Sequence, residues 1–330
     1  MNSKIKFLVQ LGIQIQNDPL LSEIIQFAYI KNNWFTPEYC RKSIDNIIKY
    51  YLQEDLLEAF LSHYPKKKYS GNIALILAGN IPLVGFHDLL CAYLVGENIQ
   101  VKLSHKDEVL MKYFIEKLNS IDQNANINIT ERLENIGKII ATGSENTNRY
   151  FEYYFRKYPH LLRSNRTSIA VLDGKETDEQ LDAFMDDIFL YFGLGCRNVS
   201  KIFIPEAYPL NKIFEKAEKY KEVFNHQKFM NNFEYHKTLY LLSKIPFLTN
   251  DFFILKEDIA IFSPISILFY EYYTSLDTVE ERITLEKNRI QCILSNCLEG
   301  ATPFGDSQMP TLSDFADGVD TIDFLLNAHA

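Results

Sequence analysis

Apolar and polar residues follow two different rhythms along the chain, and the change comes near residue 70. Residues 1–66 place their apolar side chains three and four positions apart, as in "SEIIQFAYIKNNWF" (22–35) and "CRKSIDNIIKYYLQEDLLEAFLSHY" (40–64). That spacing predicts amphipathic helices. The polar stretch "PKKKYSG" (65–71) then predicts a break between this helical region and the rest of the chain.

From residue 72 onward, short apolar runs alternate with amphipathic stretches. The pattern predicts strands at 72–78, 98–104 and 137–143, and helices at 82–96, 108–121 and 144–158. Buried strands that alternate with helices form a parallel sheet covered on both faces. Ligands bind beyond the carboxyl ends of such strands. Those ends carry the polar, glycine-bearing stretches "AGNIP", "KLSHK" and "ATGSE".

The same alternation begins again near residue 170. An apolar run at 168–174 precedes a helical stretch at 177–195, which leads to Cys196. Further strands are predicted at 201–205, 251–255, 265–273 and 289–295, and a helix at 211–224. The final residues have the composition of a loop followed by a weak helix. We therefore predict an α/β protein of two lobes, each with a mostly parallel sheet flanked by helices.

Composition and charge exclude several classes of protein. The chain has 330 residues, 47% of them hydrophobic, and a net charge of −9 with scattered basic residues, so no nucleic-acid partner is expected. No apolar run approaches the roughly 18 residues of a membrane span. The five cysteines form no CxxC pair and no signal-peptide pattern precedes them, which predicts reduced thiols in the cytoplasm. Cys292 and Cys297 have a spacing that a metal could use, but without acidic or histidine companions core thiols are favoured, and no metal is expected.

Cys196, in "YFGLGCRNVSKIF" (191–203), is either a packing residue or a nucleophile. Free cysteine is among the most buried residue types, which favours packing. A nucleophilic thiolate would need donors for the oxyanion that it creates. Asn80, at the end of a predicted strand, is a candidate donor, although asparagine is also a common turn residue and helix cap and Pro82 suits a first helical turn.

Several motifs, taken in order, resemble those of the aldehyde dehydrogenase superfamily and, more closely, its LuxC-type acyl-CoA reductases. They are "LAGNIPLVGFHDLL", "VKLS", "ATGS", "FGLGCRNVSKIFIP", "FSP" and "PFGDSQMPTLSDFADGVDTIDFL". The resemblance extends from about residue 70 to the end of the sequence. It implies that Cys196 forms an acyl thioester with the substrate. It also implies that Asn80 and the backbone N–H of Cys196 hold the oxyanion.

The resemblance also implies a set of cofactor-binding residues. Lys102 matches a lysine that contacts the adenosine ribose, and Ser104 belongs to the same motif. Gly143 and Ser144 match a turn where a helix N-terminus, with its free N–H groups, lies against the cofactor. Phe262 matches a residue that lines the nicotinamide side, and the late "PFG" loop carries Phe304 toward the active site.

Two departures from the superfamily bear on the reaction. Hydrolytic aldehyde dehydrogenases activate water with a glutamate, but Leu162 and Arg163 stand at that place, which favours reduction of an activated acyl group over release of free acid. Many NAD-specific relatives have glutamate three positions after Lys102, where this chain has His105 and then Lys106. The loss of a negative charge favours NADPH, with NADH as the alternative. Solvated loop charges would explain the same residues.

Four further positions leave their alternatives open. Leu194 and Ala260 replace a glutamine and an acid that are usual in relatives, which implies a differently arranged cofactor site. His87 either polarises the substrate or occupies a helix face. Arg197 either lowers the pKa of the Cys196 thiol or pairs with a carboxylate.

These observations together predict an enzyme. We expect NADPH-dependent reduction of a long-chain fatty acyl-CoA, or of another acyl thioester, to the aldehyde through an S-acyl-Cys196 intermediate. Acyl-transferring or acyl-activating proteins are the expected partners. The alternatives are an aldehyde-oxidising dehydrogenase and a non-catalytic scaffold. The expected organisation is an N-terminal helical segment (1–66), a Rossmann-like cofactor lobe (67–167), a catalytic lobe (168–300) and an active-site loop and tail (301–330).

Overall fold

The chain folds into two compact α/β units. The computed structural model describes residues 2–143 and 145–327. Unit 1 comprises residues 1–165 together with 310–330, and unit 2 comprises residues 166–309. Within the described residues, no helix is long and apolar enough to cross a membrane.

Unit 1 begins with helices, as the spacing of apolar residues predicts. They are α1 (Asn2–Gln16), α2 (Leu21–Lys31), α3 (Pro37–Tyr50) and α4 (Glu54–Ser62). Thr36 caps α3 by accepting a hydrogen bond from the Tyr39 N–H, and Pro37 occupies the first turn, where its missing N–H costs nothing. Buried residues of all these helices join one apolar core with the helices that flank the sheet.

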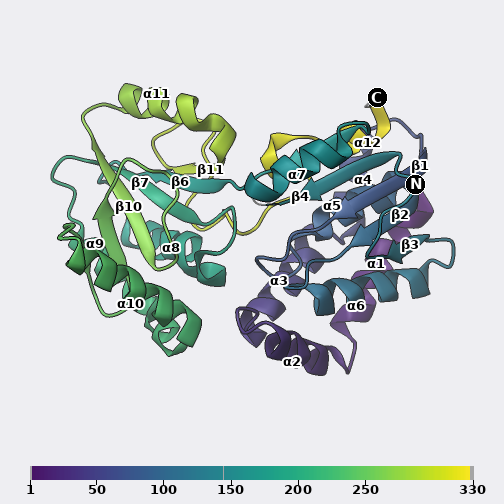
Figure 1. Cartoon of the computed structure of the whole chain (residues 1–330), viewed down its shortest axis with the longest axis horizontal. Helices are drawn as coiled ribbons and strands as arrows, with labels where there is room; N and C mark the ends of the chain where they lie inside the picture. Colours follow the sequence, from purple (N-terminus) through teal and green to yellow (C-terminus); the bar gives the residue numbers. More distant parts are fainter. Residues whose placement is uncertain (1, 144, 328–330) are drawn as a thin grey trace. The chain divides into compact units, whose positions relative to one another are not determined.

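The sheet of unit 1 is parallel, with the strand order β3-β2-β1-β4-β5. Its strands are β1 (Tyr69–Ile76), β2 (Gly96–Lys102), β3 (Ile127–Ile129), β4 (Lys138–Thr142) and β5 (His160–Arg163). The connecting helices are α5 (Phe86–Val95), α6 (Glu108–Ile121) and α7 (Glu145–Phe155), and α12 (Thr321–Asn327) packs on α5. Right-handed crossovers from β1 outward in both directions place α6 and α7 on opposite faces (Figure 1). The order reverses between β1 and β4, where such sheets bind ligands.

Three expectations for unit 1 were wrong in detail. Strand β1 begins at Tyr69, inside the predicted polar break, because its first four residues are not buried and so can be polar. Helix α5 begins at Phe86 instead of residue 82, since Leu83 takes a left-handed conformation (φ 59°) that a helix does not allow. Strands β3 and β5 were not predicted, because three and four residues give too short a pattern.

The sheet of unit 2 has the order β11-β6-β7-β10-β9-β8 and is parallel except for the β8–β9 pair. Its strands are β6 (Thr167–Val171), β7 (Val199–Pro205), β8 (Leu248–Thr249), β9 (Ile254–Glu257), β10 (Ile267–Tyr273) and β11 (Ile290–Ser295). Its helices are α8 (Asp178–Phe189), α9 (Asn211–Ala217), α10 (Gln227–Leu242) and α11 (Leu276–Glu286). Within this unit, α11 lies on one side of the strands and α8, α9 and α10 on the other (Figure 1).

The helix expected at 177–195 ends earlier, and its end shapes the site. A capping box at Thr177 and Gln180 starts α8, which stops at Phe189. Tyr191, Phe192 and Gly193 then have φ values of 54°, 58° and 74°. This left-handed turn redirects the chain toward Cys196.

Candidate active site

Cys196 lies on a tight turn that one buried side chain holds in place. Asn198 is only 2% exposed. Its Oδ1 accepts a hydrogen bond from the Gly195 N–H at 2.8 Å, and its Nδ2 donates to the carbonyl of Leu190 at 2.9 Å and to that of Asp187 at 3.1 Å. The turn that presents the thiol is therefore tied to the carboxyl end of α8.

The residues just before this turn are strained. A left-handed conformation costs an ordinary residue roughly 1–2 kcal/mol, and Tyr191 and Phe192 both adopt it. Packing offsets this cost, since both side chains are buried and the Phe192 ring lies 4.2 Å from the His226 ring, centroid to centroid. Strain of this kind persists only where surrounding contacts impose it, and it gathers at functional sites.

Ser168 connects the Cys196 turn to the sheet. Its hydroxyl donates to the Cys196 carbonyl at 3.0 Å and accepts from the Cys292 N–H at 3.1 Å. Arg197 reaches the same neighbour, with its Nη1 3.2 Å from the Cys292 Sγ. The guanidinium therefore contacts a thiol of β11, a partner that the sequence did not indicate.

Accessibility separates the five cysteines, none of which forms a disulfide. Cys40, Cys91 and Cys292 are buried, and burial raises the pKa of Cys40 to about 12 and that of Cys91 well above its ordinary value. Cys196 and Cys297 are partly exposed. Cys297 bonds back to Ser295 in its own turn through both its N–H and its Sγ.

Strand β7, which follows the Cys196 turn, also holds the loop that carries Phe262. The Ser200 hydroxyl donates to the Ile261 carbonyl at 2.5 Å, and the Lys201 ammonium donates to the Asp258 carbonyl. Lys201 is fully buried, and its Nζ lies 2.8 Å from the Glu271 carboxylate; burial lowers its pKa. Cys196 and Phe262 therefore belong to one unit and to one hydrogen-bonded framework.

The other predicted site residues lie in unit 1, at the carboxyl edge of its sheet. Asn80 lies on the loop after β1, and Gly85 is the N-cap of α5, so Asn80 does not cap that helix. Ser104 follows β2 and touches the Asn80 loop closely, since a Cβ on Gly79 would lie 2.6 Å from the Ser104 Oγ. The two loops are also joined by Asp107, which is 2% exposed and accepts the Leu83 N–H at 2.7 Å.

Gly143 follows β4 at the same edge. Its N–H donates to the Arg163 carbonyl at 3.2 Å, and a Cβ there would lie 2.9 Å from Asn148 Oδ1 and 3.0 Å from the Phe151 ring. A larger residue would therefore press against side chains of α7. Ser144, its predicted companion, lies outside the described residues.

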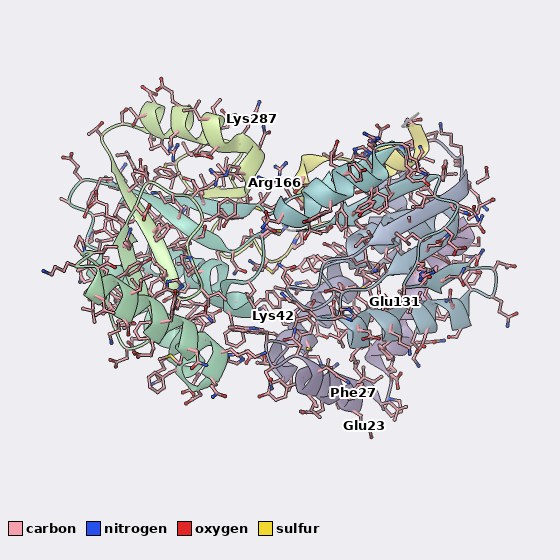
Figure 2. All side chains as sticks on the ribbon, viewed as in Figure 1. Glu23, Phe27, Lys42, Glu131, Arg166 and Lys287 are labelled. Atoms are coloured by element: carbon pink, nitrogen blue, oxygen red, sulfur yellow. The ribbon has the colours of Figure 1, made fainter. Side chains whose placement is uncertain are left out.

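Lys102 has an acidic neighbour that the sequence did not reveal. Its Nζ donates to the Glu131 carbonyl at 3.2 Å and lies 3.7 Å from the Glu131 carboxylate, which is labelled in Figure 2. The glutamate side chain is largely exposed and the lysine side chain partly so. Glu131 follows β3, the short strand that periodicity could not detect, so only the pairing of β3 with β2 brings the two residues together.

Arg163, which the sequence resemblance aligns with the hydrolytic glutamate, is part of a buried network. It is 2% exposed and binds both carboxylate oxygens of Asp88, at 2.8 and 3.1 Å. It also donates to the Thr321 hydroxyl at 2.8 Å and to the Ala316 carbonyl. This guanidinium ties β5, α5 and the C-terminal segment together, and it cannot accept a proton.

The His87 side chain is fixed by contacts with the C-terminal segment and with two aromatic rings. Its Nε2 lies 2.9 Å from the Leu312 carbonyl, and its ring packs between Tyr51 and Phe315. These contacts favour the interpretation of a helix-face histidine that anchors the C-terminal segment.

Comparisons with known proteins agree with this architecture. The family described as acyl-CoA reductase (LuxC) matches residues 28–228. No curated protein sequence matches the chain. Among solved structures, the aldehyde dehydrogenase KauB from Pseudomonas aeruginosa is similar with a TM-score of 0.64 and 11% identity, over 89% of this chain and 71% of that one.

Two further structures have the same fold. Aldehyde dehydrogenase 21 from Physcomitrella patens, in complex with succinate, gives a TM-score of 0.65 at 14% identity over 98% of this chain and 82% of that one. NADP-dependent glyceraldehyde-3-phosphate dehydrogenase from Bacillus halodurans, in complex with NADP, gives 0.61 at 13% identity over 89% and 73%. The predicted fold and family are confirmed. The chain belongs to the LuxC family of acyl-CoA reductases and is an oxidoreductase with the aldehyde dehydrogenase fold.

Proposed function

We propose that this protein reduces a long-chain fatty acyl-CoA, or a similar acyl thioester, to the aldehyde with NADPH, through an S-acyl-Cys196 intermediate. The observation that carries the proposal is the Cys196 turn, which presents a partly exposed thiol behind strained backbone in a member of an acyl-CoA reductase family. The fatty chain rests on the family and on the many aromatic residues, 24 Phe and 20 Tyr among them.

The first half of the reaction forms the acyl enzyme. The Cys196 thiolate attacks the thioester carbonyl, the carbonyl electrons move onto oxygen, and their return expels the CoA thiolate. The Cys196 N–H and the Asn80 amide are the proposed donors to this oxyanion. Because Asn198 fixes the turn, the Cys196 N–H keeps its direction without a cost of ordering at the moment of reaction.

The cofactor, when bound, supplies the hydride that converts the acyl thioester to a thiohemiacetal, from which the aldehyde leaves and the thiolate returns. The carboxyl edge of the first sheet suits a dinucleotide. It offers the Lys102 ammonium, the Ser104 hydroxyl and the first turn of α6, whose N-cap residue Asp107 makes no side-chain cap. Lys102, Ser104, Gly143 and Ser144 would hold the adenosine and phosphate groups, and Phe262 would line the nicotinamide.

The chain favours hydride transfer over hydrolysis because the place of the water-activating glutamate holds Arg163. A guanidinium stays protonated, and this one is committed to Asp88 and Thr321. The acyl enzyme should therefore persist until hydride arrives. Acyl-transferring or acyl-activating proteins of the cytoplasm are the proposed partners.

The proposal is tested by NADPH oxidation with a series of acyl-CoA chain lengths. Wild type should consume NADPH, best with long chains, and Cys196→Ala should reduce the rate by at least about 10³-fold, the scale for loss of a covalent nucleophile. Cys297→Ala, the other partly exposed thiol, is the matched control and should keep its activity. Turnover of aldehyde with NADP⁺ but not of any acyl-CoA would support the oxidising alternative instead. Inactivity in both directions would favour the scaffold.

A further inference from the structure

Asp187, near the end of α8, is a fully buried carboxylate with a complete set of partners. It is 0% exposed. Its Oδ2 accepts the Gly305 N–H at 2.6 Å, and its Oδ1 accepts the Ser307 N–H at 3.1 Å and the Ser307 hydroxyl at 2.6 Å. All three donors belong to the late loop that carries Phe304. A carboxylate in such a place must be matched by strong hydrogen bonds, since its burial is otherwise costly.

The backbone of the same residue holds the nucleophile turn. The Asp187 carbonyl accepts from Asn198 Nδ2 at 3.1 Å, and Asn198 in turn fixes Gly195, the neighbour of Cys196. One residue therefore binds the Cys196 turn through its main chain and the 303–308 loop through its side chain. Both attachments lie within unit 2.

Packing beside the carboxylate also holds the loop against α8. A Cβ on Gly305 would lie 2.9 Å from the Cβ of Ala183, one helical turn before Asp187, so the loop backbone lies directly on α8. The Phe304 ring packs on Phe184 with the centroids 5.1 Å apart. The loop and the nucleophile turn thus share α8 as a common support.

We propose that Asp187 is a positioning residue for acyl transfer, which couples the 303–308 loop to the Cys196 turn. The inference rests on the proposed role of Cys196 as the nucleophile. A thiol that attacks a thioester must be aligned with the acyl group, and misplacement by about 1 Å can lower a rate about 10²-fold. Burial raises the pKa of Asp187 to about 6, so the carboxylate is ionised and can accept all three bonds at neutral pH.

Replacement of Asp187 by asparagine tests the contribution of the side chain separately from that of the main-chain carbonyl. The variant keeps the carbonyl that Asn198 uses, and it is almost isosteric. Whichever way the amide is turned, its Nδ2 would face a backbone N–H, that of Gly305 or that of Ser307, and two donors cannot bond to each other. The loop loses one of its anchors while the Cys196 turn keeps its own.

The test is single-turnover acylation, measured as CoA thiol released from acyl-CoA in the absence of NADPH. Asp187→Asn should slow the release about 10- to 100-fold while NADPH affinity, measured by fluorescence titration, stays within about twofold. Asp186→Asn is the matched control, since its carboxylate is part-exposed and binds Tyr220 and Lys219 at the surface; it should change neither value. An unchanged release rate in Asp187→Asn would overturn the inference. Absence of CoA release in wild type would instead overturn the proposed function.

Ser307→Ala provides a milder variant, which decides the matter if Asp187→Asn does not fold. It removes one hydrogen bond to Asp187 and leaves the two backbone bonds, so acylation should slow about threefold, which corresponds to only a part of the free energy of one such bond. In the Asp187→Asn background the same change should add nothing further, because the two residues act as one unit. Fully independent effects, or no effect of Ser307→Ala on acylation, would count against the coupling.

Discussion

Single charged residues near the adenosine ribose can decide whether an enzyme prefers NADPH or NADH. In the proposed function three positions would favour a 2′-phosphate, since Lys102 and Lys106 are cationic and the resemblance places His105 where many relatives have glutamate. Glu131 opposes them, with its carboxylate 3.7 Å from the Lys102 Nζ. Two unit charges at about 4 Å interact by about 1 kcal/mol even in water, and salt reduces this further. The Glu131 carboxylate would therefore limit the proposed preference for NADPH over NADH.

We predict that Glu131→Gln raises the NADPH-to-NADH ratio of kcat/KM by about threefold to tenfold, because one negative charge is removed from beside the phosphate. The affinity for NADPH relative to that for NADH, from dissociation constants measured without acyl substrate, should rise in the same variant. Glu134→Gln removes another exposed charge from the same segment and should leave the ratio unchanged. A ratio that falls in Glu131→Gln would contradict the assignment of this edge to the adenosine ribose.

Asp187 should also affect the dependence of stability on pH. Burial raises its pKa from 3.8 to about 6, so between these values the unfolded chain releases its proton before the folded one does. The contribution of Asp187 to the free energy of unfolding is therefore full below about pH 4 and is lost as the pH rises through about 6. The change amounts to about 3 kcal/mol at most. Urea unfolding of wild type and Asp187→Asn at several pH values measures it: the stability advantage of wild type should shrink over that window. A difference that does not vary with pH would be inconsistent with the raised pKa.

Two glycines in the segment after β11 are required for reasons that can be separated. Gly305 has φ 93°, and a Cβ there would meet Ala183 at 2.9 Å. Gly300 has φ 73°, and a Cβ there would meet no atom within 4 Å. The first position has both a conformational and a steric requirement. The second has the conformational requirement alone.

Gly305→Ala should therefore destabilise the protein more than Gly300→Ala. The left-handed conformation costs about 1–2 kcal/mol at either site, and overpacking against α8 adds about 1–3 kcal/mol at Gly305 only. Chemical denaturation of both variants gives the comparison. Equal losses would mean that the 303–308 loop moves away from α8 without cost, contrary to the close approach of Gly305 to Ala183.

The whole molecule divides its proposed tasks between two units. The proposed cofactor-binding residues of the first sheet belong to unit 1, and Cys196, Asp187 and Asn198 belong to unit 2. Unit 1 also contains Trp34, the single tryptophan, partly buried against its core. Tryptophan fluorescence therefore reports the unfolding of unit 1.

NADP⁺ should stabilise the unit that Trp34 reports. At about 100 times its dissociation constant, a ligand of the folded state adds about 2.7 kcal/mol. Urea curves followed by Trp34 fluorescence should shift to higher denaturant in NADP⁺, and the shift should be smaller in Lys102→Ala. A shift seen only by far-ultraviolet circular dichroism, with the Trp34 transition unmoved, would assign cofactor binding to the other unit.

The amino-acid sequence by itself determined the alternation of strands and helices, the parallel sheets, and the family. These follow from local periodicity and from motifs of consecutive residues. Each helix or strand must bury one apolar face, so its periodicity can be recognised from the sequence of that element alone. Helix α6 was predicted with its observed bounds for this reason. Short motifs likewise predicted the candidate nucleophile and the absence of a water-activating glutamate.

Only the tertiary structure decided which distant residues act on one another. Strand β3 is too short for periodicity to detect, so the approach of Glu131 to Lys102 followed from sheet pairing alone. The left-handed turn at Tyr191 and Phe192 departs from local preference and exists because packing and Asn198 impose it. Asp187 lies far from Ser307 along the chain, and nothing in the spacing of either residue signals their bond. Such contacts arise from the burial of polar groups, which must find partners wherever the folded chain provides them.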